Sequence, residues 1–108
     1  MAKRQVRKYN DGVVKFYRKL TDKNVKSMDD LEYLGKLRFE ERSIRNSDVE
    51  YALQHDKKLS LKISTPDDGN MDTTRIAIVE NIVYAIIHID RDREKKELYF
   101  YLQEVRTL

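Results

Sequence analysis

The chain has 108 residues, of which 38% are charged, with a net charge of +3 and no cysteine. This length gives room for one domain with a modest core, and the lack of cysteine excludes disulfides and thiolate metal sites. No apolar run approaches the roughly 20 residues of a membrane helix, and the chain does not begin with the apolar segment of a signal peptide. We therefore expect a soluble protein, made in a cytoplasm, with no membrane partner.

Positive charge is concentrated at the start of the chain. Residues 1–26 hold nine Lys or Arg and two Asp, a net charge of +7, whereas the remainder carries −4. We assign residues 1–12 to a flexible basic arm and residues 13–108 to a single β-barrel domain. The cations of the arm are Lys3, Arg4, Arg7 and Lys8. Such an arm suits an acidic partner, either nucleic acid or an acidic protein surface; the alternative is a solvated terminus.

The first half of the domain predicts two strands. Residues 13–20 alternate, with Val14, Phe16 and Leu20 on the expected inner face. Gly35 opens a second strand over residues 36–45. A bulge near Glu41 would correct the shift in its alternation.

Residues 21–34 are polar and lack clean periodicity. Connections of this length between two strands are often functional. The alternative is that Ser27 and Asp30 start a short helical turn over Leu31 and Leu34, although such a stretch is short for a stable helix.

Ser47 and Glu50 have the spacing of a reciprocal capping box. They predict a helix over residues 48–56, with Val49, Ala52 and Leu53 on one face. A helix this short must be held by packing against the barrel.

The second half predicts four short alternating strands. They span residues 59–64, 75–79, 83–89 and 97–103, separated by turn signals at 66–70, 80–81 and 90–93. The alternation groups Leu59, Leu61 and Ile63, then Ile76 and Ile78, then Leu98, Phe100 and Leu102. We expect a mainly β fold: a small six-stranded antiparallel β-barrel or sandwich with one apolar face, one short helix and a long loop between strands one and two.

No group of residues indicates catalysis. His55 and His88 have no second His or Cys at metal-ligand spacing. The favoured interpretation of His88 is a partly buried strand residue, and that of His55 a cation near a helix C-terminus. We interpret residues 67–70 as a turn and not as a calcium-binding loop, because they lack the spaced ligands that such a loop needs. We expect no enzyme activity, no catalytic residue, no metal and no cofactor.

Tyr84, Tyr99, Phe100 and Tyr101 suggest a stacking platform for nucleic acid, with the basic arm on phosphates. Against this, Tyr99 and Tyr101 lie among Glu97, Gln103 and Glu104 on the polar face of their strand, where a single-strand binder would need cations. We favour a structural tyrosine face or a subunit interface.

Several segments resemble one family of virion proteins. They are residues 35–42, 47–52, 58–63 and 82–90, followed by a closing strand that ends at 102–105. In these strings and in the order of elements, the chain resembles the head–tail joining (head-closure, "stopper", or head–tail adaptor) proteins of long-tailed bacteriophages and prophages. The likeness extends over about residues 13–106, and Glu80-Asn81 stands where a glycine is common in that family.

The resemblance implies a non-enzymatic head–tail connector subunit. Such a subunit forms a ring with copies of itself under the portal or adaptor protein, retains packaged DNA without sequence preference, and docks the tail or its completion protein. It is made in the bacterial host cytoplasm and resides in the virion. The implied channel or partner loop carries Lys23, Asn24, Lys26, Asp29 and Asp30. The alternatives are a nucleic-acid-binding, oligonucleotide-binding-like barrel that acts alone and a general partner-binding module.

Overall fold

The computed structural model describes residues 9–108, so the arm residues Lys3, Arg4, Arg7 and Lys8 lie outside the described part. The strands are β1 (Gly12–Lys19), β2 (Leu31–Glu41), β3 (Leu61–Pro66), β4 (Ile76–Val79), β5 (Ile82–Asp92) and β6 (Glu97–Thr107); the helices are η1 (Met28–Asp30) and α1 (Asn46–Gln54). Since β1 begins at Gly12, the last residue assigned to the arm belongs to the sheet.

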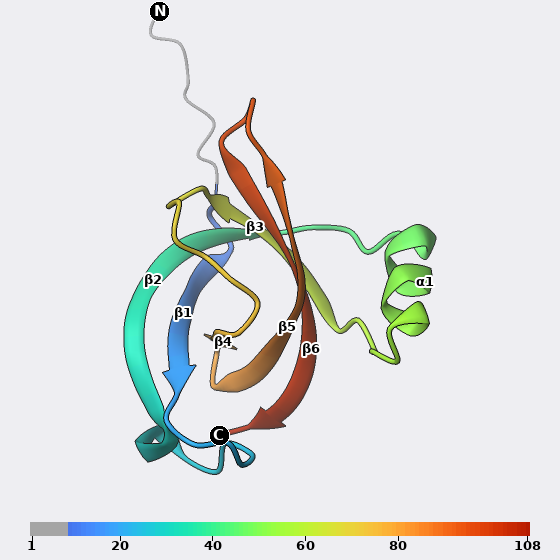
Figure 1. Ribbon diagram of the computed structural model, residues 1–108. Coiled ribbons are helices and arrows are strands. Elements are labelled where there is room, and N and C mark those ends of the chain that lie inside the picture. Colours follow the sequence, from blue (N-terminus) through green and yellow to red (C-terminus); the bar gives the residue numbers. More distant parts are fainter. Residues whose placement is uncertain (1–8) are drawn as a thin grey trace, which may run out of the picture.

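All six strands form one antiparallel sheet that closes on itself. Their order is β1-β2-β3-β6-β5-β4, and β1 also pairs with β4 through Lys15, Phe16 and Tyr17. Figure 1 shows the strands arranged around the core, with the β5–β6 hairpin extending beyond the ring. The prediction of a mainly β, six-stranded antiparallel fold with one short helix is confirmed.

The core inside the sheet contains residues from every strand. Phe16 and Phe100 lie at its centre, with ring centroids 5.3 Å apart, and both are almost completely buried. The other buried members are Val14, Phe39, Ile63, Ala77, Val79, Tyr84, Ile86, Leu98 and Leu102. The alternation of apolar and polar residues therefore predicted the inward residues of β6 correctly, because successive side chains of a strand point to opposite faces of the sheet.

Strand β4 is buried on both faces, which corrects the prediction of a single apolar face. Ala77 and Val79 point into the main core, whereas Ile76 and Ile78 belong to a second cluster. That cluster also contains Tyr17, Val25, Leu31 and Val83. A run of apolar residues without alternation is typical of a strand covered on both sides, and here the 20–30 loop supplies the cover through Val25.

The predicted course of β2 was partly wrong. The strand starts at Leu31, so the connection from β1 is shorter than the expected residues 21–34, and it ends at Glu41 before the predicted end at Arg45. The irregularity lies at Leu34, where the β1–β2 register shifts, and not near Glu41. Leu20 lies beyond the end of β1 and is 58% exposed, so its assignment to the inner face was wrong.

The predicted turn at Glu80-Asn81 is confirmed. It joins β4 to β5 with two residues whose φ angles are 50° and 67°. Two consecutive left-handed residues are the geometry of a type I′ hairpin turn, which favours Asn and Gly.

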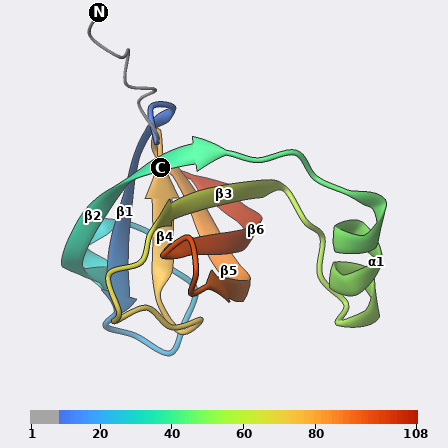
Figure 2. The ribbon, with the colours of Figure 1, turned by 90° about the horizontal axis from the view of Figure 1, so that it is seen from above.

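Helix α1 stands apart from the sheet, on the side opposite β1 and β2, in both views of the ribbon (Figures 1 and 2). It begins after Arg45, whose backbone amide donates to the Asp48 carboxylate at 2.9 Å, so the predicted capping by Ser47 and Glu50 was wrong. Ala52 is buried, but Val49 is 39% and Leu53 is 62% exposed. The predicted apolar face is therefore divided, and two of its three members point away from the sheet.

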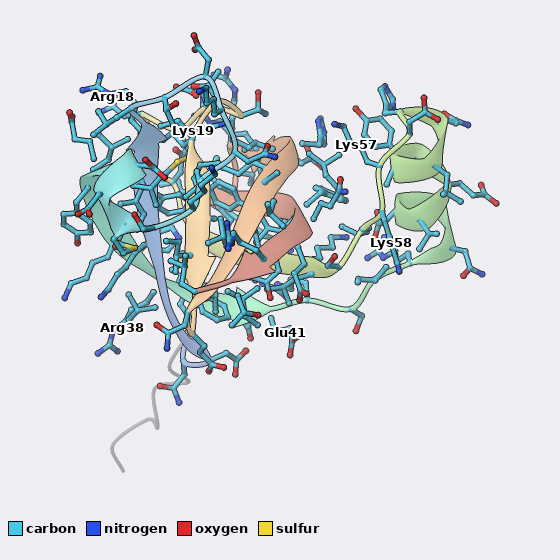
Figure 3. The ribbon with its side chains drawn as sticks, turned by 90° about the horizontal axis from the view of Figure 1, so that it is seen from below. Arg18, Lys19, Arg38, Glu41, Lys57 and Lys58 are labelled. Atoms are coloured by element: carbon cyan, nitrogen blue, oxygen red, sulfur yellow. The ribbon has the colours of Figure 1, made fainter. Side chains whose placement is uncertain are left out.

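The side chains confirm this separation. Lys57 and Lys58, just after α1, lie far across the molecule from Arg18 and Lys19 at the end of β1 (Figure 3). Of the nine cations in residues 1–26, five lie in β1 and the 20–30 loop: Lys15, Arg18, Lys19, Lys23 and Lys26. Much of the positive charge that the sequence places at its start therefore belongs to the folded domain.

Candidate functional site

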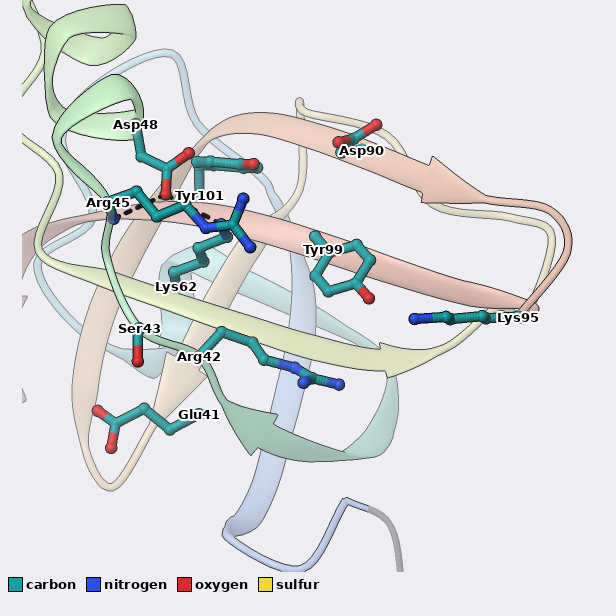
Figure 4. A pocket seen from close by; sticks show the side chains of 10 residues that line it. All are labelled: Glu41, Arg42, Ser43, Arg45, Asp48, Lys62, Asp90, Lys95, Tyr99 and Tyr101. Atoms are coloured by element: carbon teal, nitrogen blue, oxygen red, sulfur yellow. Dashed lines mark hydrogen bonds and ion pairs between the residues drawn. The ribbon is translucent and has the colours of Figure 1, made fainter.

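A polar cleft of about 530 Å³ lies where the segment before α1 approaches the sheet. It is lined by Glu41, Arg42, Ser43, Arg45, Asp48, Lys62, Asp90, Lys95, Tyr99 and Tyr101. Figure 4 shows that these side chains come from the end of β2, the connection from β2 to α1, the first turn of α1, strands β3, β5 and β6, and the turn between β5 and β6. We call this the α1 cleft.

A buried ion pair forms the inner wall of the α1 cleft. Lys62 Nζ lies 2.9 Å from Asp48 Oδ2, and both side chains are about nine-tenths buried. The Lys62 ammonium also lies 5.0 Å from the centroid of the Tyr101 ring. This pair is one of the few links between α1 and the sheet, so it fixes where the helix stands.

The hydrogen bonds to Asp48 determine its ionisation. Burial alone would raise the pKa of the carboxyl group, but the hydrogen bonds from the Arg45 amide and from Lys62, with the charge of Lys62, outweigh it. The pKa of Asp48 is therefore lowered, and the carboxylate is charged at neutral pH.

Asp48→Asn should make the stability of the protein less sensitive to acid. The folded pKa of Asp48 lies below the unfolded value of about 3.9, so the carboxylate contributes stability above that pH and loses it as pH falls through the folded pKa. Urea unfolding of parent and variant from pH 7 to pH 2 should give a stability difference that shrinks at the acid end. Asp22→Asn, in an exposed loop, is the control for replacing an aspartate by asparagine without a buried ion pair. A difference that stays constant over the whole range would contradict this.

Arg42 holds the second set of ion pairs. Its guanidinium donates to Ser64 Oγ at 2.8 Å and to Glu97 Oε2 at 3.2 Å, and lies 3.0 Å from Glu40 Oε2. Glu97 is almost fully buried. Tyr9 also contacts Glu97. The burial of Tyr9, its hydrogen bond to the Glu97 carboxylate and the negative charge of that carboxylate raise the pKa of the Tyr9 phenol to about 12. Arg42 thus joins β2 to β3 and β6 at the entrance to the α1 cleft.

Four aromatic rings link the helix to β5 and β6. Ring centroids are 4.6 Å apart for His55 and Tyr51, 5.1 Å for Tyr51 and His88, and 5.4 Å for His88 and Tyr101. His88 is half-buried in this stack, as predicted. His55 is the C-cap of α1, also as predicted, and its Nδ1 lies 2.9 Å from the Tyr51 carbonyl oxygen.

The tyrosine face differs from the expectation in one respect. The sequence suggested that Tyr99 and Tyr101 lack neighbouring cations, which was wrong: Arg42 lies 5.6 Å from the centroid of Tyr99, and Lys62 covers Tyr101. These cations come from β3 and from the residue after β2, and alternation within β6 gives no sign of them. Since both are already bound to carboxylates, they stabilise the tyrosines in place.

The predicted loop residues lie together in the 20–30 connection. Lys23, Asn24, Lys26 and Asp29 are exposed, whereas the Asp30 carboxylate accepts hydrogen bonds from the Lys26 and Ser27 amides at 2.9 and 3.3 Å. These backbone hydrogen bonds lower the pKa of Asp30. The alternative of a helical turn started by Ser27 and Asp30 is confirmed as η1, but the turn ends at Asp30 because Leu31 already belongs to β2.

The 20–30 loop is anchored by a residue that the sequence argument missed. Val25 is buried in the second cluster, and its carbonyl oxygen accepts a hydrogen bond of 2.8 Å from Arg106 Nη1 in β6. A single valine in a polar segment is the only signal for this anchor. The burial of Val25 and its hydrogen bond from Arg106 therefore hold the charged 20–30 loop against the sheet.

The α1 cleft carries charges of both signs, because Glu41 and Asp90 also line it and neither forms an ion pair within residues 9–108. Within residues 9–108, Arg45 and Lys95 line the cleft and form no ion pair, while Arg42 and Lys62 are neutralised by carboxylates. In the same range, no group of three His, Cys, Asp or Glu residues is arranged to hold a metal ion. None of the helices in residues 9–108 has the length and apolar character required to cross a membrane.

Asp67 belongs to the predicted turn after β3. Its carboxylate accepts a hydrogen bond from the Gly69 amide at 2.8 Å and lies 3.0 Å from Arg91 Nε. The turn therefore also ties the β3–β4 connection to β5.

The sequence matches none of the protein-family models, and no curated protein shows significant similarity to it.

Proposed function

We propose that this chain is a head–tail connector subunit of a phage or prophage virion. In this proposal, copies form a ring under the portal or adaptor protein, retain packaged DNA and dock the tail. The observation that carries the proposal is the position of α1, a helix that projects from a closed sheet with Val49 and Leu53 exposed. The sheet closes on itself, but β2 pairs with β3 only through Glu40 and Glu41, so part of β2 remains an open edge. The projecting helix with its exposed apolar residues is a further element suited to contact with a neighbour.

The division of charge supports the same assignment. The β1 side and the 20–30 loop carry Lys15, Lys19, Lys23 and Lys26, while α1 lies on the other side of the molecule. A ring needs two different complementary surfaces on each subunit. The lysines of the β1 side also suit a DNA channel, because contact with phosphates needs positive charge without sequence preference, while Lys57 and Lys58 place further cations beside α1.

The proposal is tested by locating the protein in particles. Antibody labelling of phage particles from the cells that encode this chain should place it at the junction of head and tail. Deletion of its gene should leave heads and tails unjoined. Particles that lack the protein, or normal tailed particles after deletion, would contradict the proposal.

A loop variant separates assembly from folding. Lys23→Ser, Lys26→Ser and Asp29→Ser together alter exposed charges and leave the Asp30 cap intact, so stability should change by no more than about 0.5 kcal/mol for each substitution. Thermal melting should stay close to that of the parent, whereas particles made with the variant should leak DNA or fail to join tails. Fully infectious particles would exclude this function for the loop. Unfolding of the variant would show that the loop acts through stability.

A second candidate function is nucleic-acid binding by the protein alone. It is favoured by Arg45 and Lys95, which line the α1 cleft beside Tyr99. A phosphate binder loses affinity steeply with salt. Binding of a labelled single strand by the monomer, weakened both by salt and by Arg45→Ala with Lys95→Ala, would support this function over the connector.

A further inference from the structure

A second hollow of about 460 Å³ lies on the side of the molecule that carries β1. It is lined by Val13, Lys15, Tyr17, Met28, Ile78, Glu80, Asn81 and Leu108. Val13, Met28 and Leu108 are exposed large apolar side chains, and buried Tyr17 and Ile78 contribute to the lining. We call this the β1–β4 hollow; apolar and polar atoms contribute about equally to its surface, and its lining includes one cation and one anion.

The outward face of α1 has the matching character. Asn46, Val49, Glu50 and Leu53 follow the spacing that places residues on one side of a helix, and all four are exposed. Leu53, at 62%, is the most exposed large apolar side chain in residues 9–108. The opposite side of the helix, with Asp48, Tyr51, Ala52 and His55, contains the contacts to the sheet and the buried residues.

We infer that the outward face of α1 docks into the β1–β4 hollow of the next copy of this chain. Val49 and Leu53 then enter the apolar lining, and Glu50 meets Lys15. Within residues 9–108, neither Glu50 nor Lys15 forms an ion pair. Glu80 at the hollow has counterparts in Lys57 and Lys58, which follow α1.

The positions of the two surfaces determine the kind of assembly. Since α1 lies on the side opposite β1 and β2 (Figures 1 and 2), the two surfaces of one copy cannot meet each other. A contact between different surfaces of identical subunits is heterologous and repeats from copy to copy, which generates a ring when the rotation closes. The inference rests on the proposed function, because it names the contact that the connector ring needs.

The chain contains no cysteine, so the contact can be tested with introduced thiols. Leu53→Cys and Val13→Cys proteins are prepared separately, mixed at high concentration and treated with a short bismaleimide. The mixture should give a covalent dimer, and neither single variant should do so alone. The control mixture replaces Val13→Cys with Leu20→Cys, which is exposed but lies beyond the end of β1. Proximity in the docked state should give a roughly tenfold or higher dimer yield than the control.

Charge reversal supplies a second measurement. Glu50→Lys in the Leu53→Cys protein should lower the dimer yield, and Lys15→Glu in the Val13→Cys partner should restore it. A dimer of Leu53→Cys alone would show that α1 packs against its own counterpart and would overturn the inference. A mixture no better than the Leu20→Cys control would also overturn it.

The two proposals fail separately. If the thiols couple but the protein is absent from phage particles, the connector function is excluded and the contact between copies stands. A protein found at the head–tail junction whose thiols do not couple would retain the function and exclude this contact.

Discussion

Phe100→Ala should lower the free energy of unfolding by about 3–5 kcal/mol, the typical cost of truncating a buried aromatic ring. Phe100 is 0% exposed and packs against Phe16 across the core, with 5.3 Å between ring centroids. Its neighbours belong to pairings that close the sheet, Ile63 in β3 and Ile89 in β5. The small residue would leave a cavity that these strands cannot fill without changing their register.

Urea unfolding measures this cost directly, provided that the m-value stays unchanged. Val105→Ala is the matched control, because Val105 lies on the same strand but is exposed, so its cost should stay within about 0.5 kcal/mol. A Phe100→Ala loss below about 1 kcal/mol would mean that the ring does not occupy the centre of the core.

Lys62→Met should destabilise the protein by about 3 kcal/mol, since removing one partner of a buried pair leaves the other charge uncompensated. The charge left behind is Asp48, which would keep its hydrogen bond to the Arg45 amide and lose the one to Lys62. Because this pair links α1 to β3, the variant should also loosen the stack between Tyr51 and His88. Nuclear magnetic resonance spectra of the histidine rings should report that change.

A double-mutant cycle separates the pair from the rest of its surroundings. Lys62→Met combined with Asp48→Leu removes both charges, and replacing a whole buried pair with apolar residues is often close to neutral. The double variant should therefore be more stable than Lys62→Met alone. Additive losses would show that the two residues act independently. Lys95→Met, also a lysine of the α1 cleft but without an ion pair in residues 9–108, is the control.

The site was harder to predict than the fold because its residues are distant in sequence. Arg42 and Glu97 are 55 positions apart and meet only because β3 lies between β2 and β6. Lys62 and Asp48 are 14 apart, and nothing in their surroundings marks them as partners. The predicted loop residues, by contrast, are neighbours in sequence, and their grouping needed no knowledge of the fold.

The sequence by itself determined the six strands and the one α-helix, the inward positions of Val14 and Phe16 in β1, the inward residues of β6 and the turn at Glu80-Asn81, and it offered the capped turn at Ser27 as one of two alternatives. These depend on side-chain alternation and on backbone preferences within a few residues. Only the tertiary structure decided that β4 is covered on both faces and that Val49 and Leu53 face away from the sheet. Those outcomes depend on which distant segment covers a face. Apolar residues recur at the same spacing whether the face that they form packs against the core of the protein or stays exposed for contact with a partner.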